Sequence, residues 1–163
     1  MMSIEEITQL AIRAHSGQKD MIGNPAILHV LAVGLMGETE QEKKAGFLHD
    51  VVEDTDLTLE DLRRQGIEED VLAAVDLLTH RDGISYEDYV RNIVASGNET
   101  AIHVKLNDLR QNIGRAADSI LTLESCGRRD DALLREIVRI AALHGWAEQY
   151  IEEALAQRPQ VLS

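Results

Sequence analysis

The sequence has few aromatic residues, one cysteine, two prolines and no long apolar run. Aromatic residues make up only 3% of the 163 residues, Cys126 is the one cysteine, and the two prolines are Pro25 and Pro159. A single cysteine excludes an intramolecular disulfide and a cluster of thiolate metal ligands. No apolar run approaches the roughly 18 residues that a membrane-spanning helix needs. The core must therefore consist of Leu, Ile, Val and Ala, which suits packed helices with few proline interruptions.

Basic residues are also scarce, because 16 Lys and Arg stand against 29 Asp and Glu, for a formal net charge of -13. Such a surface repels DNA, RNA and anionic lipids, which argues against nucleic-acid and membrane partners. A phosphate-bearing substrate would be repelled too, unless a metal ion or a local basic cluster reversed the field. Residues 1–6 lack the basic region of a secretory signal, so the expectation is cytoplasmic residence.

The β-branched residues fall at helical rather than alternating spacing. We therefore predict an all-α fold, a single bundle-like domain of eight or nine helices over residues 1–163. Capping patterns place helix starts at these positions: Ser3, Asn24, Thr39, Thr58, Ser85 and Asn98. The helix that begins at Thr39 is expected to continue to about Asp54. Residues 68–80, 99–112, 118–126 and 130–155 are expected to form separate helices.

The densest group of chemistry-bearing residues lies at positions 49–54, which read His-Asp-Val-Val-Glu-Asp. On a continuous helix, Glu53 lies four residues after His49 and Asp54 four after Asp50, so each pair shares a face. Without a counter-charge, three carboxylates packed together would destabilise the fold. A divalent cation resolves this conflict, because imidazole and carboxylate are good ligands for Mn, Fe or Zn. The alternative interpretation is a helix end with a solvated acidic face.

Two further segments carry side chains able to complete such a site. His29 lies on the preceding predicted helix, although a lone histidine is more often a satisfied core residue. Lys105, Asp108 and Asn112 share one helix face by their i, i+3, i+7 spacing. Asp108 could bind a metal ion, while Lys105 and Asn112 could contact phosphate oxygens or a metal-bound water. The alternative is an ordinary polar face with a Lys-Asp pair.

The order His, His-Asp, Asp resembles that of the HD superfamily of metal-dependent phosphohydrolases. The closer likeness is to the hydrolase domain of RelA/SpoT-type enzymes and their small stand-alone relatives, which cleave the alarmone ppGpp. Three stretches carry the likeness: residues 14–29, 46–55 and 104–112. The Glu-Asp extension of the His-Asp pair is much more specific than His-Asp alone. The resemblance spans residues 10–112, with the C-terminal helices expected as packing.

The resemblance implies one divalent metal ion, usually manganese, with iron, zinc, nickel or magnesium as alternatives. The implied metal ligands are His29, His49, Asp50 and Asp108. The residues implied to position and deprotonate the attacking water are Glu53 and Asp54. The residues implied to lie beside a phosphorylated nucleotide substrate are Lys19, Lys105 and Asn112.

Several positions depart from the family pattern. Asp20 stands where relatives carry the second residue of a basic pair that begins at Lys19. Ala26 replaces an aromatic residue, Val30 a proline and Asn107 a small apolar residue, and the stretch before the last ligand is shorter. None of these changes touches an implied metal ligand, so they bear on the substrate more than on the chemistry.

The predicted reaction is hydrolysis of a phosphoester or phosphoanhydride, with ppGpp as the expected substrate and pyrophosphate released from its 3′ position. Two alternatives stay open. One is an HD phosphohydrolase acting on another nucleotide, such as a nucleoside monophosphate or a dinucleotide cofactor. The other is a non-catalytic, metal-bound sensor or interaction module.

Overall fold

The computed structural model describes residues 1–127 and 130–159, and within these ranges the chain forms nine α-helices and no named β-strand. The prediction of an all-α fold is therefore confirmed. The chain divides into two compact units, Met1–Asp108 and Leu109–Ser163. The single HD domain over residues 1–163 stays a prediction. Among the described helices, none is both long enough and apolar enough to cross a membrane.

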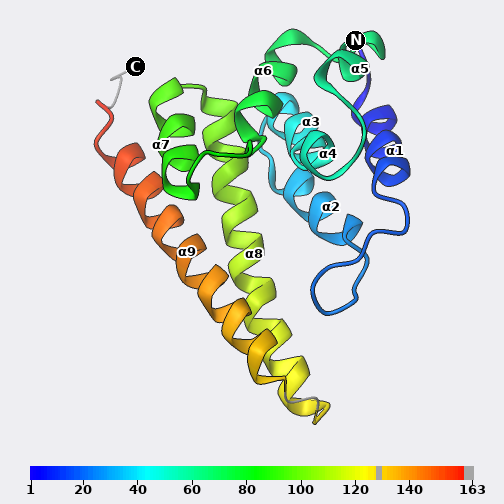
Figure 1. Cartoon of the computed structure of the whole chain (residues 1–163). Coiled ribbons are helices and arrows are strands. Elements are labelled where there is room, and N and C mark those ends of the chain that lie inside the picture. The colour runs from blue at the N-terminus through cyan, green and yellow to red at the C-terminus, as the bar shows by residue number, and fades with distance from the viewer. Residues whose placement is uncertain (128–129, 160–163) are drawn as a thin grey trace. The chain divides into compact units, whose positions relative to one another are not determined.

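The helices follow one another along the chain as Figure 1 shows. Their bounds are α1 Ile4–Ala14, α2 Ile27–Met36, α3 Glu40–Leu48, α4 Val51–Asp54, α5 Leu59–Arg64, α6 Glu69–Leu78, α7 Tyr86–Ser96, α8 Glu99–Ser125 and α9 Asp131–Ala156. In the first unit, α3 packs against α1, α2 and α6. Its apolar core comes mainly from α1, α2, α3, α6 and α7, and from the first turns of α8.

Capping boxes start three of these helices at the positions that the sequence predicts. The hydroxyls of Ser3, Thr39 and Thr58 accept the backbone N–H three residues later, and the acidic side chain there bonds back. Each box satisfies donors that a helix N-terminus leaves without a partner. Ser85 also caps α7 as predicted, and Asp130, at the predicted start of the last helix, caps α9.

The predicted start of α2 at Asn24 is wrong. The helix begins at Ile27 with Ala26 as its N-cap, and no side chain caps it. The residues before it form a closed loop instead, because Asp20 N–H donates to the Asn24 carbonyl and Ala26 N–H donates to the Gln18 carbonyl. Asn24 therefore takes part in closing the loop and does not cap the helix.

The predicted continuous helix from Thr39 to Asp54 is also wrong. Helix α3 ends at Leu48, and the short α4 begins at Val51 after an interruption at His49 and Asp50. The helical backbone is interrupted at Asp50, whose φ of -99° and ψ of -5° depart from ideal helix values. The two residues of the His-Asp pair therefore lie in a turn between helices.

A third difference concerns α8, which the sequence predicts as two helices, 99–112 and 118–126, with Gly114 between them. The structure has one helix of 27 residues. A glycine inside a helix costs only about 1 kcal/mol relative to alanine, so a single one does not end a helix.

Helices α2 and α3 approach each other closely at two glycines. A Cβ atom on Gly46 would lie 2.8 Å from the Cα atom of Gly34, and one on Gly34 would lie 2.2 Å from the Phe47 ring. Real Cβ atoms essentially never come this close to other atoms. The contact brings the helix that carries His29 against the helix that ends before His49.

The second unit is built by the rest of α8 and by α9, which run antiparallel in Figure 1. Arg110 on α8 donates to Glu152 at 2.8 Å and to Glu148 at 3.3 Å, both on α9. Leu123 and Ile137 are buried on the two helices. The unit is therefore a helical hairpin with ion pairs along one side.

Candidate metal centre

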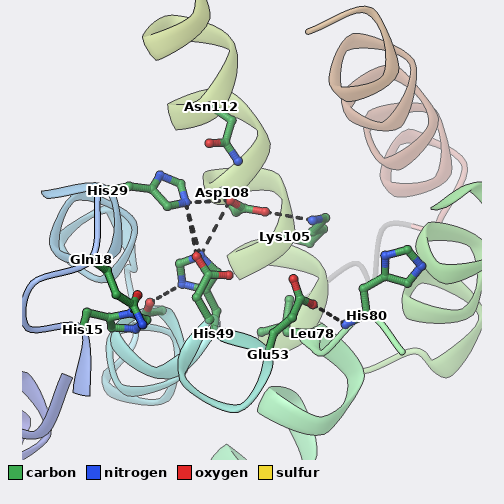
Figure 2. Close-up of polar contacts among 12 residues, drawn as sticks. His15, Gln18, His29, His49, Glu53, Leu78, His80, Lys105, Asp108 and Asn112 are labelled. Carbon is green, nitrogen blue, oxygen red and sulfur yellow. Dashed lines mark hydrogen bonds and ion pairs between the residues drawn. The ribbon is translucent and has the colours of Figure 1, made fainter. Parts of the chain in front are cut away.

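Two buried histidines face each other inside the first unit (Figure 2). His29 on α2 and His49 after α3 expose only 7% and 3% of their surfaces, and their Nε2 atoms lie 3.3 Å apart. The Oδ2 atom of Asp50 lies 3.2 Å from the His49 Nε2 and 3.9 Å from the His29 Nε2. The three side chains thus offer nitrogen and oxygen atoms within 4.8 Å of one another. This spacing and these donors fit a divalent metal ion.

A backbone carbonyl fixes which nitrogen of His49 carries its proton. The Nδ1 atom of His49 lies 2.7 Å from the carbonyl oxygen of Gly46. A carbonyl can only accept a hydrogen bond, so Nδ1 is the donor. In the neutral ring, Nε2 then keeps its lone pair and faces His29 and Asp50, as a metal-ligating nitrogen must.

Asp108 on α8 closes the other side of the histidine pair. Its Oδ1 atom lies 2.9 Å from the His29 Nε2 and 3.7 Å from the His49 Nε2. Its Oδ2 atom accepts a hydrogen bond of 2.8 Å from the Lys105 ammonium. The structure therefore brings together all four residues that the resemblance implies as ligands. Their role as ligands stays a prediction.

Strong local charges act on His49 and Asp108. Burial disfavours the charged form of His49, yet the carboxylates of Asp50 and Asp108 raise its pKa well above the ordinary histidine value. Burial likewise opposes ionisation of Asp108, but the Lys105 ammonium and the two histidines hold the pKa of that carboxyl well below its usual range. The centre attracts positive charge, so a divalent cation would compete there with a proton.

Glu53 and Asp54 lie on α4, directly after the break. The backbone N–H of His80 donates to Oε1 of Glu53 at 2.6 Å. Both side chains reach solvent, yet partial burial raises the pKa of each carboxyl group, and the negative charge of Asp50 adds to the rise. An open groove of about 570 Å³ runs beside them. It is lined by Ala14, Gln18, Glu53, Asp54, Thr55, Asp56 and Leu57.

The sequence did not predict the contact that connects the segment at residues 14–18 with α4. His15 is 2% exposed, and its Nδ1 atom lies 2.8 Å from Oε1 of Gln18. The Gln18 amide donates in turn to the backbone carbonyl of Asp54 at 2.8 Å. His15 and Gln18 lie inside the first stretch of the family likeness, which could have drawn attention to them. The atom that Gln18 contacts is a backbone carbonyl, which no sequence motif marks.

The loop after α1 explains how the chain accommodates Asp20. Its Oδ1 atom accepts the backbone N–H groups of Ile22 at 3.0 Å and Asn24 at 2.9 Å. Lys19 is exposed on this loop and forms an isolated β-bridge with Pro25. The acidic residue thus holds the loop closed, and its neighbour keeps a side chain that solvent can reach.

The other two residues implied to contact substrate differ in position. Lys105 is buried, with 6% of its surface exposed, and its ammonium contacts Asp108. Asn112 lies on α8 beyond Asp108, in the second unit. The roles of Lys19, Lys105 and Asn112 toward a substrate stay predictions.

Comparison with known proteins identifies relatives of this chain, although no protein-family model matches it. A GTP pyrophosphokinase of Streptomyces coelicolor is 41% identical over 90 residues, which are 53% of this chain and 10% of that protein. The guanosine-3′,5′-bis(diphosphate) 3′-pyrophosphohydrolase of Aquifex aeolicus is 32% identical over 120 residues, or 68% of this chain and 17% of that protein. The chain is a relative of the RelA/SpoT-type enzymes.

The fold agrees with this RelA/SpoT-type relationship. A solved structure of a metazoan ortholog of SpoT, described as hydrolysing ppGpp, superposes with a TM-score of 0.59 at 22% identity. The match covers 97% of this chain and 96% of that one. The chain spans only 10% and 17% of the length of the two RelA/SpoT-type relatives above. The resemblance that the motifs predicted is thereby confirmed, and these relatives are named as enzymes of ppGpp and GTP metabolism.

Proposed function

We propose that this chain is a metal-dependent phosphohydrolase that removes the 3′-diphosphate of ppGpp. One observation carries the proposal: two buried imidazole Nε2 atoms lie 3.3 Å apart with the carboxylates of Asp50 and Asp108 beside them. Two carboxylates and two imidazoles at this spacing, all buried except the partly exposed Asp50, need a cation or a proton among them. His29, His49, Asp50 and Asp108 would hold the metal ion, and manganese is the ion that we expect.

A divalent metal ion held there would lower the pKa of a water molecule toward neutrality and would stabilise charge on the phosphoryl oxygens. The protein supplies the remaining parts of the reaction. Glu53 and Asp54 would accept the proton of the attacking water, and partial burial, which raises the pKa of each carboxyl group, makes each a stronger base than an exposed carboxylate. Water attacks the phosphorus bonded to the ribose 3′ oxygen. The bond between this phosphorus and the 3′ oxygen breaks, the 3′ oxygen takes up a proton, and GDP and pyrophosphate are released.

The names of the relatives support ppGpp as the substrate but include both directions of its metabolism. The Aquifex aeolicus relative is named for 3′-pyrophosphohydrolysis, and the Streptomyces coelicolor relative is named a GTP pyrophosphokinase. The residues of this chain favour hydrolysis, because the predicted ligands and the carboxylates of α4 suit the activation of a water molecule.

A second candidate substrate is a nucleotide that carries less negative charge than ppGpp. The observation in its favour is Asp20, whose carboxylate is held inside the loop beside Lys19. Where relatives have a basic pair for a diphosphate, this loop offers one base and one acid. A non-catalytic sensor is less well supported, because a sensor has no need of Glu53 and Asp54.

The test is pyrophosphate release from ppGpp by the manganese-loaded protein, with Asp50→Ala as the matched variant. We expect release by the wild type and none above background by the variant. The same preparation is incubated with ATP and GTP to test for ppGpp synthesis. Manganese binding without turnover of ppGpp, but with turnover of another nucleotide in a panel, would replace ppGpp by that substrate. Manganese binding with no turnover of any phosphorylated compound would contradict the proposed hydrolase.

A further inference from the structure

Lys105 is a lysine whose ammonium group is enclosed by protein. Only 6% of the residue is exposed, and its Nζ atom lies 2.8 Å from Oδ2 of Asp108. The same atom lies over two aromatic rings, 5.0 Å from the centroid of Tyr89 and 5.4 Å from that of Tyr86. An ammonium within about 6 Å of an aromatic face is attracted by the ring's electrons. One carboxylate and two ring faces thus surround this cation.

The ring of Tyr89 is itself held in place. Its hydroxyl donates to the backbone carbonyl of Leu78 at 2.5 Å, and its ring stacks on His80 at 4.7 Å with an interplanar angle of 19°. The backbone N–H of His80 also holds Glu53. Leu78, at the end of α6, and His80, just after it, therefore hold both Glu53 and the Tyr89 ring that packs on the Lys105 ammonium.

The ion pair between Lys105 and Asp108 determines which oxygen of Asp108 faces the histidines. The ammonium occupies Oδ2, and Oδ1 is the oxygen that lies 2.9 Å from the His29 Nε2 (Figure 2). Rotating the carboxylate would break a buried, charge-assisted hydrogen bond, which is stronger than a neutral one. Of the two oxygens, the ion pair therefore leaves Oδ1 for the centre.

We propose that Lys105 is a positioning residue, which orients the Asp108 carboxylate and balances its charge and does not bind the substrate. The inference rests on the proposed function, because it takes Asp108 as a metal ligand. Residues that support a metal ligand from behind typically contribute 10- to 100-fold to metal affinity. A lysine that binds substrate phosphate would act on KM instead.

The deciding experiment measures Mn²⁺ affinity by calorimetric titration of the purified, full-length protein without substrate, for the wild type and Lys105→Met. We expect Mn²⁺ to bind the variant 10- to 100-fold more weakly. At saturating Mn²⁺, we expect KM for ppGpp to stay within about twofold of the wild type. Lys43→Met, on α3, is the matched control for loss of a lysine charge, and its Mn²⁺ affinity should be unchanged.

Unchanged Mn²⁺ affinity in Lys105→Met, together with a raised KM, would overturn the inference. If Lys105→Met does not fold, Tyr86→Leu decides, because it removes one ring face and keeps the ammonium and Asp108. Weaker Mn²⁺ binding by Tyr86→Leu supports the inference, and unchanged binding overturns it. The readout needs no turnover. A wild type that binds Mn²⁺ and hydrolyses nothing would therefore contradict the proposed function while still testing Lys105.

Discussion

Three hydrogen bonds each fix one side chain of the candidate centre. The Gly46 carbonyl holds His49, the Lys105 ammonium holds Asp108, and the His80 backbone N–H holds Glu53. The sequence predicted the residues of the centre because they belong to motifs with fixed spacing. It offered the Lys105–Asp108 pair as an alternative interpretation, but it did not predict the Gly46 carbonyl or the His80 N–H, because backbone atoms carry no side-chain signature.

At the residue scale, we predict that the ionised carboxylate of Glu53, the proposed general base, lowers the stability of the fold. Partial burial raises the pKa of Glu53, so the folded protein binds more protons at this group than the unfolded chain does. The destabilisation therefore grows as pH rises from the ordinary glutamate pKa through the raised one. Glu53→Gln keeps an oxygen that can accept the His80 N–H. It should raise the thermal unfolding midpoint of the metal-free protein at pH 7, and the gain should shrink at pH 5.

The measurement compares each variant with the wild type at the same pH, in the presence of a chelator. Glu124→Gln, at an exposed position on α8, serves as the control and should change the midpoint little at either pH. The catalytic rate of Glu53→Gln should fall by roughly 10²- to 10⁴-fold, the usual contribution of a general base. A Glu53→Gln protein that unfolds at a lower temperature than the wild type at pH 7 would contradict the argument.

At the scale of helices, the centre depends on where α3 stops. Capping boxes at Ser3, Thr39 and Thr58 were predictable, because a cap is a local pattern of side chains. The interruption at His49 and Asp50 was not, since the residues around it continue a helical spacing. What holds the pair in a turn is tertiary contact with α2 and α8, which a local pattern does not contain.

The glycine contact between α2 and α3 gives the prediction at this scale. Gly46→Ala places a methyl group 2.8 Å from the Cα atom of Gly34, so two backbones must separate. Overpacking of this kind typically costs about 1–3 kcal/mol. We expect Gly46→Ala to lower the free energy of unfolding in urea by that amount and to weaken Mn²⁺ binding, because the Gly46 carbonyl holds His49.

Gly114→Ala is the matched control for the glycine contact. It lies inside α8, and nothing lies within 4 Å of the added Cβ. The substitution should stabilise the protein by about 0.5–1 kcal/mol, the usual gain when alanine replaces glycine in a helix. Equal effects of the two substitutions would show that the α2–α3 contact is not tight.

For the molecule as a whole, the predicted ligands connect distant parts of the sequence. His29 lies on α2, the His49-Asp50 pair follows α3, and Asp108 lies on α8. The all-α fold was predictable from spacing and composition. The division after Asp108 was not, because α8 continues across it without a break in the sequence pattern.

A metal ion bound by residues so far apart in the chain should stabilise the folded protein strongly, since the unfolded chain cannot assemble the site. At a free Mn²⁺ concentration 100 times the dissociation constant, the expected gain is about 2.7 kcal/mol. We expect the thermal unfolding midpoint to rise with added Mn²⁺, to return after treatment with a chelator, and to stay constant in Asp50→Ala. A wild-type midpoint that does not respond to Mn²⁺ would contradict the predicted centre.

The spacing of residues from Gly46 to Asp54 restricts where residues can be inserted into the chain or deleted from it. One residue inserted between Gly46 and His49 would turn the imidazole by about 100° around α3, because a helix makes one turn in 3.6 residues. The bond from Nδ1 to the Gly46 carbonyl would then be lost. Residues 65–68, between α5 and α6, take part in none of the contacts described for the centre. Insertions and deletions should therefore be tolerated there and be absent from residues 46–54, from the loop that carries His80, and from residues 105–108.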